Sequence, residues 1–124
     1  MKIVLASLLA VAGLTVPAVA LAHAKVTAST PAANTTVAPT STISMTFNEK
    51  TMPAFSGANV AMTGMPVMAN HSPMKITGLK PSWSADGKTL TLTAGRAFPK
   101  GTYQVNWRAG GADAHRMQGS FTFT

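Results

Sequence analysis

The clearest signal in the sequence is the alternation of apolar and polar residues in short segments. In residues 41–47 every second residue is apolar, which places Ile43, Met45 and Phe47 on one face of a predicted strand. Residues 101–109 repeat this pattern. Successive side chains of a strand point to opposite sides, so each of these segments predicts a strand with one buried face and one exposed face.

Turn-forming residues separate these two segments from others of similar length. The further predicted strands are residues 24–29, 57–62, 74–79, 89–94 and 119–124. Residues 80–88 are predicted to form a turn region, in which Asp86-Gly87 is a strong signal for a hairpin. No helical periodicity extends beyond a few residues. About seven short strands predict a single all-β domain, either an antiparallel Greek-key sandwich or a small barrel.

Residues 1–22 have the features of a cleavable secretory signal. An early positive charge at Lys2 is followed by an apolar stretch that glycine and proline interrupt, and the segment ends in Ala-Leu-Ala at residue 22. Signal peptidases recognise small residues in this arrangement. We therefore predict an exported mature domain of residues 23–124, in which no later segment is apolar enough to span a membrane.

The composition narrows the classes of function. The sequence contains no cysteine, which excludes disulfides, a thiol nucleophile and the thiolate ligand of a blue-copper site. The formal net charge is +7, and removal of Lys2 with the signal lowers it by one. Basic residues are scattered and form no arginine-rich run, so nucleic acid is not expected as a partner. Only three acidic residues and three histidines occur, and their positions are therefore informative.

A run of methionines with one histidine lies between the third and fourth predicted strands. Met62, Met65, Met68, His71 and Met74 follow one another at intervals of three residues. Glycine and proline within the run oppose an α-helix, whereas every third side chain shares a side in an extended or polyproline-like segment. Thioether sulfur suits Cu(I) and imidazole suits several transition metals, so the run is a candidate soft-metal site. The alternative is that these methionines fill gaps in an apolar core.

A second group of candidate ligands contains the other two histidines. Cleavage after residue 22 would leave His23 at the N-terminus, where its ring Nδ1 and the free α-amine can chelate one metal ion. Asp113 and His115 are two residues apart in a loop before the last predicted strand, and in an extended chain such residues face the same side. Nitrogen and carboxylate donors suit Cu(II). The alternative is that Asp113 bonds to its own backbone in a turn and that His115 is a solvated surface side chain.

These features together resemble the CopC/PcoC family of periplasmic copper-resistance proteins over essentially the whole predicted mature region. The similarity rests on the histidine after the signal, the Met/His run and the W-R…D-x-H segment. The matching stretches are STPAANTTV, MTFNEK, FSGANVAMTGMPVMANHSPM, GTYQVNWRAGGADAH and GSFTFT. The spacers Gly111, Ala112 and Ala114 differ from those common in the family, which affects the expected loop conformation and leaves the ligands intact. Met52 and Met117 match no ligand position and are expected to be structural.

The resemblance implies a cupredoxin-like or immunoglobulin-like β-sandwich or small barrel with copper sites at its two ends. The family's Cu(II) ligands correspond to His23, Asp113 and His115, and Glu49 matches an acidic position near that site. The family's Cu(I) ligands correspond to His71 with a subset of Met62, Met65, Met68 and Met74.

The function that the resemblance implies is copper binding for resistance or homeostasis in the periplasm. The protein would sequester or carry Cu(I) and Cu(II), exchange them with membrane or outer-membrane copper-handling proteins, and have no enzymatic activity. An N-terminal histidine chelate also binds copper in polysaccharide monooxygenases, so a copper-dependent oxidative enzyme is the main alternative. Against it, one tyrosine and two tryptophans offer no obvious flat aromatic surface for a polysaccharide. A structural β-sandwich that binds no metal is the third possibility.

Overall fold

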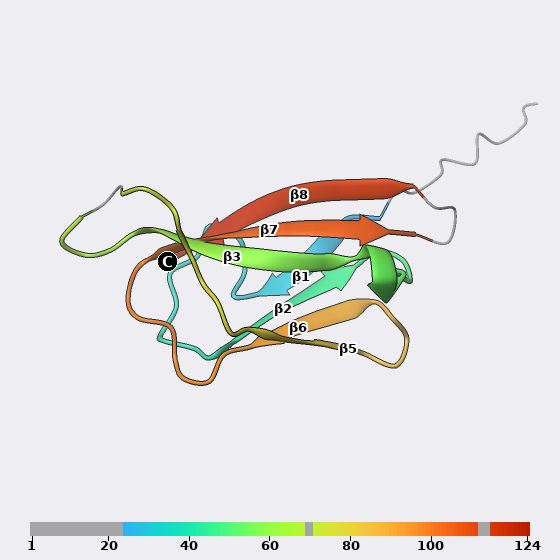
Figure 1. Ribbon diagram of the computed structural model, residues 1–124, viewed down its shortest axis with the longest axis horizontal. Helices are drawn as coiled ribbons and strands as arrows, with labels where there is room; N and C mark the ends of the chain where they lie inside the picture. The colour runs from blue at the N-terminus through green and yellow to red at the C-terminus, as the bar shows by residue number, and fades with distance from the viewer. Residues whose placement is uncertain (1–23, 69–70, 112–114) are drawn as a thin grey trace, which may run out of the picture.

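The computed structural model describes residues 24–68, 71–111 and 115–124, which form two four-stranded antiparallel sheets (Figure 1). The strands along the chain are β1 (Val26–Thr30), β2 (Thr42–Phe47), β3 (Gly57–Gly64), β4 (Met74–Lys75), β5 (Lys80–Trp83), β6 (Thr89–Thr93), β7 (Thr102–Gly110) and β8 (Arg116–Phe123), with a short 3-10 helix η1 (Pro53–Phe55). One sheet has the order β1-β2-β6-β5 and the other β4-β3-β7-β8. The all-β class predicted from the sequence is confirmed. No helix in the described ranges is long and apolar enough to cross a membrane.

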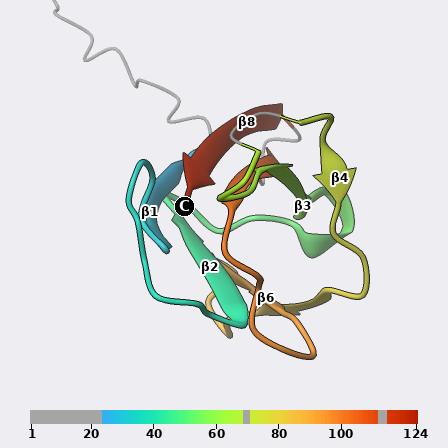
Figure 2. The same cartoon turned by 90° about the vertical axis from the view of Figure 1, so that its left-hand side faces the viewer.

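The hydrophobic core lies between the two sheets, which face each other in the end-on view of Figure 2. From β2, Ile43, Met45 and Phe47 are each no more than 1% exposed, which confirms the alternation seen in the sequence. Other large core residues include Val60, Met62, Leu90, Leu92, Tyr103, Val105 and Phe123. These residues come from both sheets, so burial of apolar surface joins the two layers in a chain that has no cysteine.

The order of elements differs from the prediction between residues 74 and 88. The strand predicted over residues 74–79 is only two residues long, and residues 80–83, predicted as part of a turn, form β5. Pro81 is tolerated there because β5 is an edge strand, where a missing N–H need not interrupt the ladder. The predicted Asp86-Gly87 hairpin is confirmed: Gly87 has a φ of 69°, and its N–H donates to the Ser84 carbonyl at 2.9 Å.

Gly101, just before β7, lies in close contact with the end of β3. A Cβ at this position would lie 2.5 Å from the carbonyl oxygen of Gly64, which is a backbone atom and moves only if the strand moves. We expect Gly101→Ala to lower the free energy of unfolding by about 1–3 kcal/mol, measured by urea denaturation. Gly95→Ala is the matched control, because a Cβ there meets no heavy atom within 4 Å. An equal loss in both variants would contradict the tight β3–β7 contact.

Candidate metal centres

The Met/His run forms a hairpin at one end of the second sheet, the left-hand end in Figure 1. Across its turn, the N–H of Met65 donates to the carbonyl of Met68 at 2.8 Å, and the N–H of Met68 donates back at 2.9 Å. Farther from the tip, the N–H of His71 donates to a carbonyl of β3 at 3.1 Å, and Met74 pairs with Met62. The run therefore doubles back on itself, and the polyproline-like segment expected from the sequence is not formed.

The local sequence explains this turn. Pro66 and Val67 are the two residues between the paired methionines. Proline fixes φ near the value that the second position of a four-residue turn requires, so Pro66 favours reversal of the chain at this point. The proline that argued against a helix also argues against one continuous extended segment.

The hairpin places sulfur-bearing side chains side by side. Residues directly opposite in an antiparallel pair project to the same face with Cβ atoms about 4.5–5.5 Å apart. Met65 and Met68 form one such pair, and Met62 and Met74 form another. Met68 and Met74 are 53% and 54% exposed, whereas Met62 is 7% exposed and belongs to the core. The run thus combines surface methionines with one that also packs in the interior.

His71 has an imidazole whose two nitrogens differ sharply. Its Nδ1 lies 2.7 Å from the backbone carbonyl oxygen of Ser72, and because a carbonyl only accepts, Nδ1 carries the hydrogen. Nε2 is buried and has no hydrogen-bond partner among the described residues. In the neutral ring Nε2 then carries the free lone pair. Metal-binding histidines commonly donate their other N–H to a backbone carbonyl in this way, which fixes the tautomer and the ring orientation.

The other group of predicted ligands is described only in part. His23 and Asp113 lie outside the described residues, as does the whole predicted signal segment. Glu49, after β2, is partly exposed, and His115, just before β8, is exposed. Within the described ranges, no cluster of three or more histidine or acidic side chains is arranged to hold a metal ion. The Cu(II) ligand set therefore stays a prediction.

Backbone contacts bring the segments next to these residues together at the right-hand end of Figure 1. Ala24, the first described residue, is 2% exposed within the core. The Lys25 N–H donates to the Asn48 side-chain oxygen at 2.8 Å, and the Asn48 N–H donates back to the Lys25 carbonyl at 3.0 Å. Thr51 pairs with Gly111 in an isolated antiparallel β-bridge. The start of the domain, the loop after β2 and the loop after β7 thus meet at one end.

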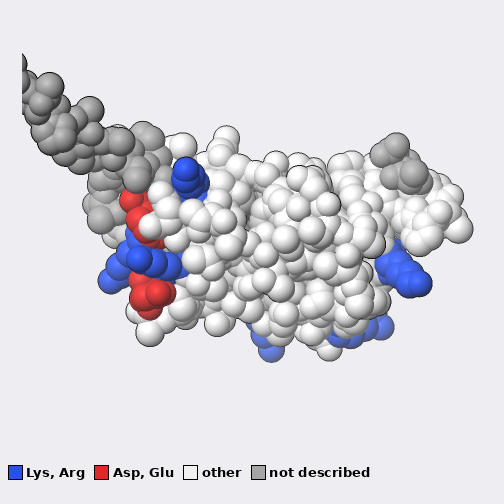
Figure 3. Space-filling model, turned by 180° about the vertical axis from the view of Figure 1, so that it is seen from behind, with Lys and Arg blue, Asp and Glu red and all other residues white. Residues whose placement is uncertain are grey.

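Charged side chains gather at this same end. Figure 3, seen from behind, shows acidic and basic side chains together there, whereas the broad middle of that face carries none. Asp86 accepts hydrogen bonds from the Ser84 hydroxyl and, at 3.0 Å, from the Lys88 N–H, and these bonds hold the pKa of its carboxyl below the usual value. Asp86 therefore stabilises the β5–β6 turn.

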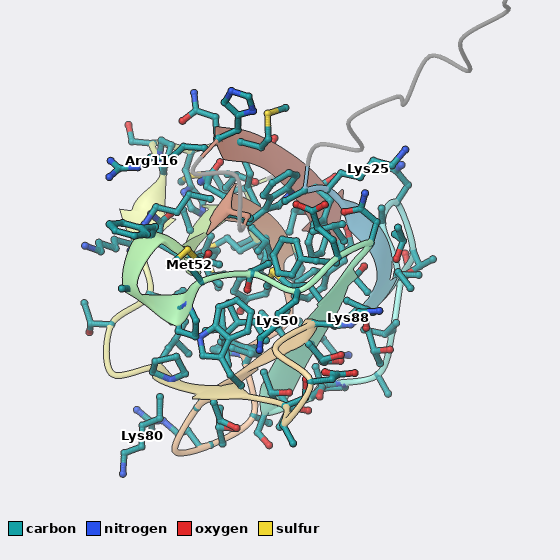
Figure 4. The ribbon with its side chains drawn as sticks, turned by 90° about the vertical axis from the view of Figure 1, so that its right-hand side faces the viewer. Lys25, Lys50, Met52, Lys80, Lys88 and Arg116 are labelled. Atoms are coloured by element: carbon teal, nitrogen blue, oxygen red, sulfur yellow. The ribbon has the colours of Figure 1, made fainter. Side chains whose placement is uncertain are left out.

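Met52, labelled in Figure 4, was expected to be structural but is 41% exposed.

The residues that fix these loops were not predicted from the sequence. Thr51 is buried, and its hydroxyl donates to the Gly87 carbonyl at 3.0 Å. Ser56 is also buried, and its hydroxyl accepts the Gly110 N–H at 3.0 Å. No signal distinguishes such residues beforehand, because isolated polar residues near turns are ordinarily interpreted as solvent-exposed.

Comparison with known protein families shows which family this chain belongs to. Residues 26–124 match the CopC domain. The chain belongs to the CopC family. This confirms the family resemblance drawn from the sequence motifs. Copper resistance protein C of Escherichia coli is 40% identical over 105 residues, which cover 85% of this chain and 82% of that protein. The proteins of the same name from Xanthomonas campestris pv. juglandis and Pseudomonas syringae pv. tomato are each 42% identical, over 85% and 90% of this chain and 81% and 87% of theirs.

Solved structures of CopC-family proteins have the same fold. PcoC from Escherichia coli, described as a methionine-rich copper resistance protein, has a TM-score of 0.74 at 39% identity over 83% of this chain and 98% of its own. CopC from Methylosinus trichosporium OB3b has a TM-score of 0.65 at 23% identity over 82% and 92%. The second likeness concerns the fold alone.

Proposed function

We propose that this CopC-family protein binds copper in the periplasm and sequesters or carries it for copper resistance or homeostasis. The relatives named copper resistance protein C and the methionine-rich PcoC support a role in copper handling. The observation that carries the proposal is the buried Nε2 of His71, which has no hydrogen-bond partner among the described residues and lies in a methionine hairpin. An unsatisfied buried polar atom costs about 1–3 kcal/mol, and a metal bond would offset that cost.

The proposed Cu(I) site combines His71 with two or three of the four methionines. The cross-strand pair of Met65 and Met68 supplies two thioethers on one face, and Met62 and Met74 are the candidates for a further sulfur. Thioether and imidazole donors suit Cu(I), which accepts soft ligands. Because the surface methionines are about half exposed, copper can enter and leave without unfolding of the core.

The proposed Cu(II) site lies at the opposite end and uses His23, Asp113 and His115, with Glu49 as a further ligand or a partner of one. Its support is the meeting of the chain segments that flank these residues. Removal of residues 1–22 would create the α-amine that completes the His23 chelate. Nitrogen and carboxylate donors suit Cu(II), so the oxidation state would select the end at which copper is held.

The proposed role requires copper to pass to or from other proteins. A change in oxidation state weakens one ligand set and favours the other, which gives a physical reason for copper to leave either site. Membrane or outer-membrane copper-handling proteins are the proposed partners, because the predicted signal directs the chain across the inner membrane.

Titration of the processed protein with each copper ion tests this function. The chain should begin at His23, and Cu(I) and Cu(II) should each be titrated against a competing chelator of known affinity. We expect one tightly bound ion of each kind per chain. Failure to bind either ion would leave a structural β-sandwich as the remaining interpretation.

We propose that the protein is not an enzyme, and an oxygenation assay on polysaccharide tests this separately. Copper-loaded protein, a reductant and oxygen should give no oxidised sugar beyond that produced by His23→Ala. Turnover by the wild-type protein above this control would show that the protein is an oxidative enzyme, and would contradict the proposal that it only carries copper.

A further inference from the structure

A small pocket opens on the outer face of the second sheet, close to the predicted Cu(II) end. It encloses about 360 Å³. Its lining residues are Ala54, Phe55, Arg108, Arg116, Met117 and Gln118. None of these residues is among the predicted copper ligands.

The strand register brings two guanidinium groups to this pocket. Arg108 of β7 is opposite Gln118 of β8, and Arg116 is two residues before Gln118. Residues two apart on a strand share a face, so Arg108 and Arg116 are diagonal neighbours on the same face. The pocket therefore presents two permanent positive charges, because arginine stays protonated in proteins.

Local packing holds both guanidinium groups in place. The Arg116 Cζ lies 4.9 Å from the centroid of the Phe55 ring, which is a cation–π contact. Phe55 in turn covers Gly110, where a Cβ would lie 3.0 Å from the Phe55 Cβ. The Arg108 guanidinium lies against Gly57, where a Cβ would come within 3.0 Å of Nη2. The absence of side chains at Gly57 and Gly110 thus makes room for Arg108 and Phe55 in the pocket wall. Figure 4 shows Arg116 at the edge of this end of the sandwich.

The two positive charges are not neutralised within the part of the chain that the structure describes. Neither Arg108 nor Arg116 has an acidic partner among those residues. Two like charges lining one pocket repel each other, and an anion between them would replace that repulsion by attraction to both. The pocket is therefore complementary to an anionic ligand.

We propose that this pocket binds a small polycarboxylate anion. The planar fork of each guanidinium matches the two oxygens of a carboxylate, and two forks favour a ligand with more than one carboxylate. Phe55 and Met117 offer apolar contact to a carbon skeleton, which a simple inorganic oxyanion lacks. The Gln118 amide supplies both a donor and an acceptor for a hydroxyl or a further carboxylate. The volume lies within the range of small-molecule pockets.

The position of the pocket links it to copper. Arg116 directly follows His115 in the chain, and carboxylate oxygens are Cu(II) donors. A Cu(II) polycarboxylate held by the two arginines would hold its metal close to His115, the predicted Cu(II) ligand adjacent to Arg116. This link rests on the proposed Cu(II) site, whereas the anion site does not require copper.

Citrate titration of copper-free protein tests the anion site without involving copper. At constant pH and ionic strength, we expect saturable shifts of the backbone amide NMR signals of Arg108, Arg116 and Gln118. Arg108→Gln and Arg116→Gln should each weaken citrate binding by about tenfold, the effect of losing a hydrogen-bonded charge pair. Arg96→Gln removes the same charge from the β6–β7 loop and should leave the affinity unchanged.

Three outcomes would overturn the proposal. Shifts that do not saturate would mean that citrate does not occupy the pocket. Equal weakening in Arg96→Gln would mean that citrate responds to net charge alone. Sulfate binding as tightly as citrate would remove the assignment to carboxylates. Because the protein contains no copper in these experiments, failure here leaves the proposed copper function untouched, and failure of the copper titrations leaves this result valid.

Discussion

Replacing His71 with alanine is expected to weaken Cu(I) binding by about 100-fold, because the imidazole is proposed as a direct ligand and loss of even an outer partner of a ligand costs about 10–100-fold. The structure shows why the Nε2 of His71 is available to a metal ion. Nδ1 is engaged by the Ser72 carbonyl, which leaves the buried Nε2 for the metal. Competition against a chromophoric Cu(I) chelator measures the affinity directly.

The same variant should fold normally. His71 is partly exposed, and its side chain makes one hydrogen bond among the described residues, to the carbonyl of the adjacent Ser72. The substitution also removes the buried Nε2, whose missing partner costs free energy, so His71→Ala should not lower the melting temperature of copper-free protein. Met45→Leu is a useful control, because Met45 is fully buried between the sheets and lies outside the hairpin. It should leave Cu(I) affinity unchanged. Wild-type Cu(I) affinity in His71→Ala would remove His71 from the ligand set.

Adding one glycine before His23 is expected to weaken Cu(II) binding by about 100-fold, by the same ligand-loss reasoning. The extension ties the nitrogen of His23 into a peptide bond and moves the free amine one residue away, so the chelate of amine and Nδ1 is lost. Isothermal titration of Cu(II) against a competing ligand measures this loss. The two proteins compared differ only at the N-terminus, which makes the extended chain a sharper probe than a histidine substitution.

The extension also has an internal control. Cu(I) binding should be unaffected, because the methionine hairpin lies at the other end of the sandwich (Figure 1). Unchanged Cu(II) affinity in the extended protein would show that the α-amine is not a ligand. In that case Asp113, His115 and Glu49 would have to bind Cu(II) with the His23 ring alone.

Much of the fold could be predicted because burial imposes a simple pattern on strands. Residues 41–47 alternate clearly, and Ile43, Met45 and Phe47 are all buried as expected. β5 could not be predicted because Pro81 argues against a strand, and only the tertiary structure shows that β5 is an edge where proline is tolerated. The brevity of β4 likewise depends on pairing with β3 and not on its own composition.

The candidate Cu(I) site could be predicted in its residue types but not in its geometry. The spacing of Met65, Met68 and His71 suggested a shared side of an extended segment, yet the methionines are paired across a turn. A repeat of three is compatible with a polyproline-like segment. In the structure, however, Met65 and Met68 lie opposite each other because the chain reverses at Pro66. The tautomer of His71 depends on a carbonyl whose direction no sequence pattern indicates.

The proposal of two independent copper sites is tested most directly by measuring both the Cu(I) and the Cu(II) affinity of two variants of the processed protein. One variant combines His71→Ala with Met65→Leu, and the other is His115→Ala. The first should lose Cu(I) binding and retain Cu(II) binding, and the second should do the reverse. Equal loss of both ions in either variant would contradict two independent sites at opposite ends of the sandwich.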